Sequence, residues 1–206
     1  MNKASTHYSR RNFLKHSASS TLLTTNLTTI GTAFSQNNQL KNKPITPELY
    51  VPHWIDGNGK ETTPFTLAQH ENKWIFLKCF QNWCPGCHSS GFPALRKIVK
   101  TFGTDHEKIA FAAIQTTFEG YYTNNKAALR PLQLRYETPI PFGHDAGNPS
   151  LPKTNPKHYP NTMRDFNTRG TPWIIIISPD RHIVFENFHI KIDLLIDHLK
   201  TEFAKT

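Results

Sequence analysis

Two cysteines separated by two residues stand between an apolar run and a helical pattern. The apolar run covers residues 74–80, and its β-branched and aromatic content is typical of a buried central strand. After Cys84 and Cys87, apolar residues recur at helical spacing to about Phe102, which predicts a helix from Pro85 onward. The cysteine pair is therefore expected at the junction of a core strand and a helix.

This position favours reactive sulfur. A thiol at a helix N-terminus faces backbone N–H groups without helical partners and the positive end of the helix dipole, and both favour the thiolate over the thiol. The two-residue spacing lets the second sulfur attack a mixed disulfide formed at the first. Pro85 suits the first turn of the helix, where its missing N–H would have no partner. We therefore predict Cys84 as the nucleophile and Cys87 as the resolving thiol.

A structural disulfide and a metal site are the alternatives for these cysteines. A zinc site would need two further ligands, commonly a second Cys/His pair at close spacing, and the sequence offers none. His88 directly follows Cys87, so a copper site of two thiolates and one imidazole stays open. The motif, its placement and the leader described below favour redox exchange.

The rest of the chain alternates between strand and helix patterns. Residues 56–60 contain Asp-Gly and Asn-Gly just after apolar residues, which indicates a hairpin. Further strands are predicted at 109–114, 173–177 and 183–185, and further helices at about 125–135 and 192–204. Strands alternating with helices, then a hairpin and a last helix, predict an α/β fold around a mixed sheet.

Prolines interrupt several of these patterns. Pro93 lies inside the first helix and predicts a kink, while Pro131 is expected to kink or end the helix at 125–135. Residues 137–161 contain six prolines and little apolar periodicity. Most of this stretch is therefore predicted to be an ordered loop or insertion.

The net charge of +9 is spread unevenly along the chain. Residues 1–35 contain four basic residues and no acid, among them the pair Arg10-Arg11, followed by a weakly apolar Ser/Thr-rich stretch. This layout predicts a cleaved export signal over 1–35, a linker over 36–49 and one domain over 50–206. Export would take the mature chain to a compartment where disulfides persist.

Neither a nucleic-acid partner nor a membrane span is expected. Lysines and arginines of the mature part are scattered, without a basic run interleaved with aromatic residues. The sequence also lacks any stretch of about 18 consecutive apolar residues, so we expect no stable membrane span once the signal is removed.

Two motifs together resemble the thioredoxin superfamily. They are the Trp-Cys-Pro-Gly-Cys segment at 83–87 and the Arg-Gly-Thr-Pro segment at 169–172, whose proline follows Cys87 by 85 residues. The chain is most similar to the exported redoxin branch, the thiol-disulfide oxidoreductases of the TlpA and ResA type, from about Tyr50 to Phe203. Its paired arginines resemble a twin-arginine signal, which is read by a receptor and is not an anchor.

The resemblance implies a thioredoxin-like fold with a central mixed β-sheet flanked by helices, an N-terminal β-hairpin extension and a Pro-rich insertion. It implies that Thr171–Pro172 is a cis peptide facing the cysteines, with Thr171 offering backbone groups to a partner chain. The expected activity is dithiol/disulfide exchange with proteins of the cell envelope, without an organic cofactor or metal. Trp83, Pro85 and Gly86 are expected to shape the surface that the partner contacts.

Lys78 and Cys79 depart from the family pattern. Many thioredoxins carry a buried acid where this chain has Lys78, and we hypothesise that Lys78 reaches toward Cys87 and favours its thiolate. The alternative is that the amine extends to solvent. Cys79 is expected to be a buried, unreactive thiol, with a role in resolving or bridging as the alternative. Pro93 lies one residue further from Cys87 than the helix-kinking proline of these relatives, which leaves the helix register open.

Two other functions stay open. One is a peroxiredoxin-like peroxidase, although the segment 79–83 lacks the Pro and the Thr or Ser that such enzymes place before the reactive cysteine. The other is copper delivery through Cys84, Cys87 and His88. Two further groups of residues are candidates for a partner surface: Glu119, Tyr121 and Tyr122 after one strand, and His144, Asp145 and His158 in the Pro-rich stretch.

Overall fold

The computed structural model describes residues 45–205. The predicted leader and residues 36–44 of the predicted linker lie outside the described residues. The strands are β1 (His53–Ile55), β2 (Glu61–Thr62), β3 (Trp74–Phe80), β4 (Ile109–Thr117), β5 (Phe142–Ala146), β6 (Trp173–Ile177) and β7 (Ile183–Asn187). The helices are α2 (Phe92–Phe102), α3 (Leu129–Arg135), α4 (Asn161–Asp165) and α5 (Ile192–Phe203), with a π-helical turn η3 (Cys87–Gly91) and 3-10 turns η2 (Ala68–His70), η4 (Lys126–Ala128) and η5 (Pro156–His158).

Within residues 45–205 the strands form one mixed seven-stranded sheet in the order β2-β1-β5-β4-β3-β6-β7. Strand β3 pairs in parallel with β4 and antiparallel with β6, and β4 pairs in parallel with β5. The first hairpin, β1 and β2, extends the sheet at one edge by antiparallel pairing with β5. The fold is thioredoxin-like, as the sequence predicts.

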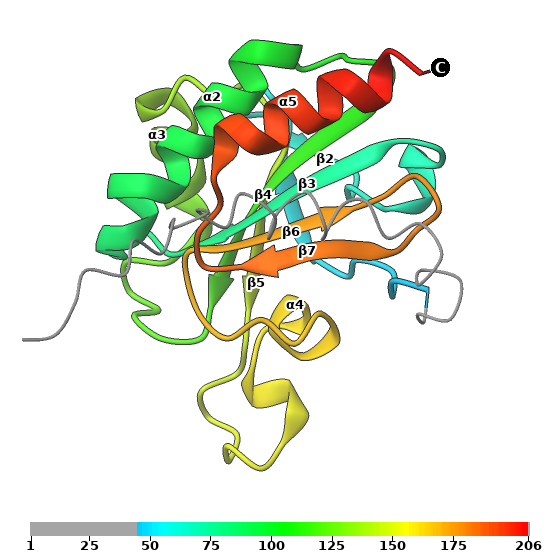
Figure 1. Ribbon diagram of the computed structural model, residues 1–206. Helices are drawn as coiled ribbons and strands as arrows, with labels where there is room; N and C mark the ends of the chain where they lie inside the picture. The colour runs from blue at the N-terminus through cyan, green and yellow to red at the C-terminus, as the bar shows by residue number, and fades with distance from the viewer. Residues whose placement is uncertain (1–44, 206) are drawn as a thin grey trace, which may run out of the picture.

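Helices cover one face of the sheet, with α2 and α5 side by side and α3 next to them (Figure 1). The opposite face packs against the chain before and after the first hairpin and against Phe166, which follows α4. Because β3 is covered on both faces, all but the first of its residues are buried. This explains why its sequence is a continuous apolar run rather than an alternating one.

The strand and helix predictions agree well with these elements, but the Pro-rich stretch needs a correction. Residues 142–146 form β5, not a loop, and pair with β4 on one side and β1 on the other. The sequence Phe-Gly-His-Asp-Ala has little strand propensity of its own. Pairing with two neighbouring strands therefore decides its conformation.

Pro93 and Pro131 both lie near the start of an α-helix, so Pro131 does not end its helix as predicted. Pro131 is the third residue of α3 and so lies in the first turn, where a missing N–H breaks no helical hydrogen bond. Before Pro93, the chain forms the π-helical turn η3, with the Phe92 N–H donating to the Cys87 carbonyl oxygen five residues earlier. A π turn accommodates one more residue than an α turn, which accounts for the added residue between Cys87 and Pro93.

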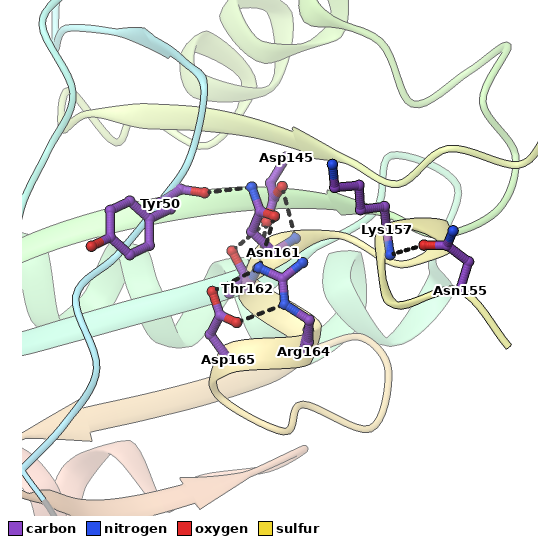
Figure 2. A network of polar contacts seen from close by, with 8 residues as sticks. All are labelled: Tyr50, Asp145, Asn155, Lys157, Asn161, Thr162, Arg164 and Asp165. Carbon is purple, nitrogen blue, oxygen red and sulfur yellow. Dashed lines mark hydrogen bonds and ion pairs between the residues drawn. The ribbon is translucent and has the colours of Figure 1, made fainter. Parts of the chain in front are cut away.

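A buried carboxylate anchors the segment that follows β5 (Figure 2). Asp145 accepts hydrogen bonds from the Asn161 N–H at 3.1 Å and from the N–H and hydroxyl of Thr162, both at 2.6 Å. The Asn161 side chain also donates to the Tyr50 carbonyl oxygen at 3.0 Å. These contacts attach the start of α4 to the sheet and to the N-terminal segment.

Residues 45–49, assigned to the linker from the sequence, contact the domain. Leu49 is buried, and the Thr46 N–H donates to the Arg181 carbonyl oxygen at 2.8 Å. The Glu48 carboxylate accepts from the backbone N–H of Leu67 at 2.5 Å. The packed part of the chain thus begins before Tyr50.

Candidate active site

The cysteine pair lies between the end of β3 and the start of the helix. The chain turns at Asn82 and Trp83, and helical conformation begins at Pro85. The sulfur atoms of Cys84 and Cys87 are 2.7 Å apart and are not joined by a disulfide. Cys84 keeps 4% of its surface exposed and Cys87 keeps none, so Cys84 is the sulfur that another molecule can reach first.

Backbone groups surround the Cys84 sulfur. The Cys87 N–H donates to Cys84 Sγ at 3.2 Å. The Cys84 thiol in turn donates to the Thr171 carbonyl oxygen at 3.3 Å. The Thr171–Pro172 peptide bond is cis. The structure therefore brings together the two motifs that the sequence analysis singled out.

Two glycines let Pro172 closely approach residues 83–91, which we call the cysteine segment. A Cβ placed on Gly86 would lie 3.0 Å from Pro172 Cδ, and one placed on Gly91 would lie 3.1 Å from Pro172 Cβ. Such distances are shorter than ordinary van der Waals contacts, so a larger residue at either position would displace the proline. Gly86 was expected to contribute to the partner surface, whereas Gly91 was not singled out from the sequence.

Lys78 is completely buried on the helix-covered face of β3. Its Nζ donates to the Cys79 carbonyl oxygen at 3.3 Å and lies 5.6 Å from the centre of the Phe92 ring. The alternative that the amine extends to solvent is therefore wrong. The strand is central and covered on both faces, so the side chain has no path to water.

Burial and neighbouring charges shift the pKa values of Lys78 and the cysteines in opposite directions. Burial lowers the pKa of Lys78, while the thiols of Cys87, Cys79 and Cys84 act to raise it. Burial raises the pKa of Cys87 to about 12, and the nearby Lys78 opposes this rise. Burial likewise raises the pKa of Cys79 to about 12, as expected for an unreactive core thiol.

His88 is held by contacts away from the sulfurs. Its Nε2 lies 2.5 Å from the Asn82 carbonyl oxygen, and its Nδ1 lies 2.6 Å from the Tyr136 hydroxyl. A carbonyl oxygen only accepts, so Nε2 carries the hydrogen. Both ring nitrogens are thus engaged, and this geometry gives no support to a copper site with Cys84 and Cys87.

No group of three or more His, Cys, Asp or Glu side chains that could hold a metal ion is found within residues 45–205. Likewise, no helix in this part of the chain has the length and apolar character needed to cross a bilayer.

The loop after β4 lies against the cysteine segment. Asn124, which is buried, accepts from the Asn82 N–H at 2.6 Å and donates to the carbonyl oxygens of Glu119 and Gly120 at 3.0 and 3.2 Å. Trp83 is 48% exposed, and its indole nitrogen would lie 3.0 Å from a Cβ on Gly120. The loop that carries Glu119, Tyr121 and Tyr122 therefore borders Trp83. The sequence analysis did not single out Asn82 or Asn124, which connect this loop to the cysteines.

The other candidate group does not form a surface. Asp145 lies in β5 and is buried, and its carboxylate accepts hydrogen bonds from Asn161 and Thr162 at the start of α4. His144 Nδ1 lies 2.7 Å from the Gln115 side-chain oxygen, and His158 Nδ1 lies 2.7 Å from the Leu151 carbonyl oxygen. The three side chains thus contact different parts of the fold and do not form a common surface.

Solved structures resemble this chain over most of its length. The crystal structure of the thioredoxin-like superfamily protein SPOA0173 is 27% identical, has a TM-score of 0.62 and covers 79% of this chain and 96% of its own. A thiol-disulfide isomerase from Corynebacterium glutamicum is 23% identical, with a TM-score of 0.63 and coverage of 78% and 97%. A thiol-disulfide oxidoreductase from Bacteroides fragilis is 15% identical, with a TM-score of 0.54 and coverage of 77% and 98%.

No protein-family model and no curated protein matches the sequence. The structural neighbours are thioredoxin-like proteins, and several of them are named thiol-disulfide isomerases or oxidoreductases. This chain thus has a thioredoxin-like fold, like that of the thiol-disulfide isomerases and oxidoreductases among these structures.

Proposed function

We propose that this protein is an exported thiol-disulfide oxidoreductase that exchanges dithiol and disulfide with protein partners through Cys84 and Cys87. The observation that carries the proposal is the pair of sulfur atoms 2.7 Å apart, with the more exposed one beside the Thr171 carbonyl oxygen. Export is supported by the basic, acid-free leader over residues 1–35.

The two cysteines carry the electrons of the reaction. The Cys84 thiolate attacks one sulfur of a partner disulfide, a Cys84–partner bond forms, and the partner's own S–S bond breaks. Cys87 then attacks Cys84 Sγ, the mixed bond breaks, and the partner leaves with both sulfurs reduced. The two electrons come from the pair, which ends as the Cys84–Cys87 disulfide. The same steps in reverse oxidise a partner dithiol.

The test follows a peptide that contains one disulfide, by mass spectrometry after acid quenching. The mature chain should convert it to the dithiol while forming one Cys84–Cys87 disulfide per peptide, and Cys79→Ala should behave in the same way. Cys87→Ser should stop at a Cys84–peptide mixed disulfide, because the resolving sulfur is gone. Cys84→Ser should form neither product.

Two results would contradict this function. One is a Cys84→Ser chain that reduces the peptide as fast as the unmodified chain. The other is catalytic peroxide consumption by Cys87→Ser with a supplied thiol, which would identify a peroxidase that uses Cys84 alone.

A further inference from the structure

Lys78 is a buried lysine without an acidic partner. None of the ion pairs found within residues 45–205 includes it, and its one hydrogen bond goes to a neutral carbonyl oxygen. Burial without a paired anion disfavours the ammonium and lowers the pKa of Lys78, so the neutral amine is favoured until an anion forms next to it.

The amine lies against the turn that carries Cys87. A Cβ on Gly91 would collide with both Nζ and Cε of Lys78, so the π-helical turn and its glycine make the space that the side chain occupies. The same point lies 3.1 Å from Pro172 Cβ. The end of Lys78 is thus enclosed by the cysteine segment, Pro172 and the Phe92 ring.

The titratable groups that raise the pKa of this amine are three thiols. Cys87 has the largest effect, followed by Cys79 on β3 itself and by Cys84. Of these, Cys79 has its side chain on the opposite face of the sheet, in the other core cluster. Cys87 is the thiol that must lose a proton before it can attack, and its burial opposes that loss.

We propose that Lys78 is the proton acceptor for Cys87 in the resolving step. This inference rests on the proposed thiol-disulfide exchange and assigns one of its proton transfers. The neutral Lys78 amine takes the proton of the Cys87 thiol, and the resulting thiolate attacks Cys84 Sγ. The Cys84–partner bond breaks, and the partner leaves as a thiolate. In the reverse direction the ammonium returns the proton to Cys87 as the disulfide is reduced.

A chromogenic aromatic disulfide separates the two steps in stopped-flow absorbance. Attack by Cys84 releases the first coloured thiolate, and attack of Cys87 on the mixed disulfide releases the second. All chains carry Cys79→Ala, so that only the pair reacts. Lys78→Met should leave the first release within about twofold of its normal rate and slow the second at neutral pH by at least about tenfold.

The pH profile separates proton transfer from a packing effect. In the chain that keeps Lys78, the rate at which the second coloured thiolate is released should rise with pH and then level off. This plateau should begin below the pH at which a buried thiol without a neighbouring amine ionises. In Lys78→Met the rate should keep rising with pH, because only solvent hydroxide remains to remove the proton. Lys78→Gln, which keeps a polar group but accepts no proton, should behave like Lys78→Met.

Two further variants serve as controls. Lys97→Met removes an exposed lysine on α2 that pairs with Asp193 at 2.5 Å, and it should change neither release. Gly91→Ala should displace the Lys78 amine and slow the second release, but it should add little when combined with Lys78→Met. This lack of additivity distinguishes the loss of the amine from a general disturbance at Pro172.

The proposal is overturned if Lys78→Met and Lys78→Gln release the second thiolate at the normal rate and with the normal pH profile. Absence of the first release from the chain with Lys78 would instead refute the proposed function itself. If replacement of Lys78 prevents folding, the Gly91→Ala chain and the pH profile of the chain with Lys78 decide. A second release that rises without a plateau into the alkaline range would then contradict a role for Lys78.

Discussion

Neighbouring residues of β3 serve opposite faces of the sheet. Lys78 packs toward the π-helical turn η3, and Cys79 packs among apolar side chains on the sheet face opposite the helices. Both groups are fully buried, and Cys87 has the largest effect of the three thiols on the pKa of Lys78. The alternation of a strand therefore places the proposed proton acceptor and the core thiol on opposite faces of the sheet.

His144 predicts an acid-sensitive contribution to stability. Burial, with smaller effects of His53 and Lys126, lowers its pKa to about 4. The unfolded chain binds this proton at higher pH than the folded chain does, so the contribution is present above the ordinary histidine pKa of about 6.5 and is lost as pH falls toward about 4. The free energy of unfolding should therefore decrease over this window.

Urea unfolding at about pH 7 and about pH 5 measures this loss. His144→Gln should show a smaller decrease between the two conditions than the unmodified chain. Other buried histidines contribute equally to both chains, so the difference between the chains isolates His144. An identical decrease in both would contradict the assignment.

At the scale of elements, strands and helices that have strong patterns need little tertiary help. The isoleucine run of β6 and the amphipathic α5 lie where the sequence predicts them. Strand β5 and helix α4 differ, because each depends on partners distant in sequence. Asp145 supplies one of these partnerships, since it is the next-to-last residue of β5 and accepts three hydrogen bonds from the start of α4.

Asp145→Ala should destabilise the protein by about 1–3 kcal/mol, because it leaves the buried donors of Thr162 unsatisfied. Hydrogen exchange should accelerate most in residues 147–170. Asp165→Ala removes a partly exposed ion pair with Arg164 and should cost less than about 1 kcal/mol. Urea unfolding and exchange mass spectrometry measure the two effects. Equal losses in both variants would show that the Asp145 network does not anchor the segment.

At the scale of the whole molecule, the cysteine site is assembled from separate parts of the chain. Cys84 follows β3, Thr171 and Pro172 precede β6, and Asn124 belongs to the loop after β4. The pairing of β3 with both β4 and β6 brings these segments to one end of the sheet. The predicted location of the protein in the cell rests instead on the export signal that the sequence predicts over residues 1–35.

Replacement of Arg10 and Arg11 by lysine tests the leader. If the pair is a twin-arginine signal, the double variant should accumulate as a full-length precursor inside the cell, because the receptor reads arginine and not charge alone. The unmodified chain should appear outside the cytoplasm with a mass that begins near Gln36. Cell fractionation with intact-mass measurement gives the answer, and Lys15→Arg serves as a charge-preserving control. Normal export of the double variant would refute this route.

Sequence alone determined the periodic elements and the position of the cysteine pair at a strand-to-helix junction, because local spacing fixes which face of a strand or helix is apolar. The resemblance to thioredoxins drew attention to Thr171–Pro172. Tertiary structure alone decided that β5 is a strand, that Lys78 is sealed in the core, and that His88 contacts Asn82 and Tyr136. Burial and partner choice depend on segments far apart in the chain, and no local pattern records which of them meet.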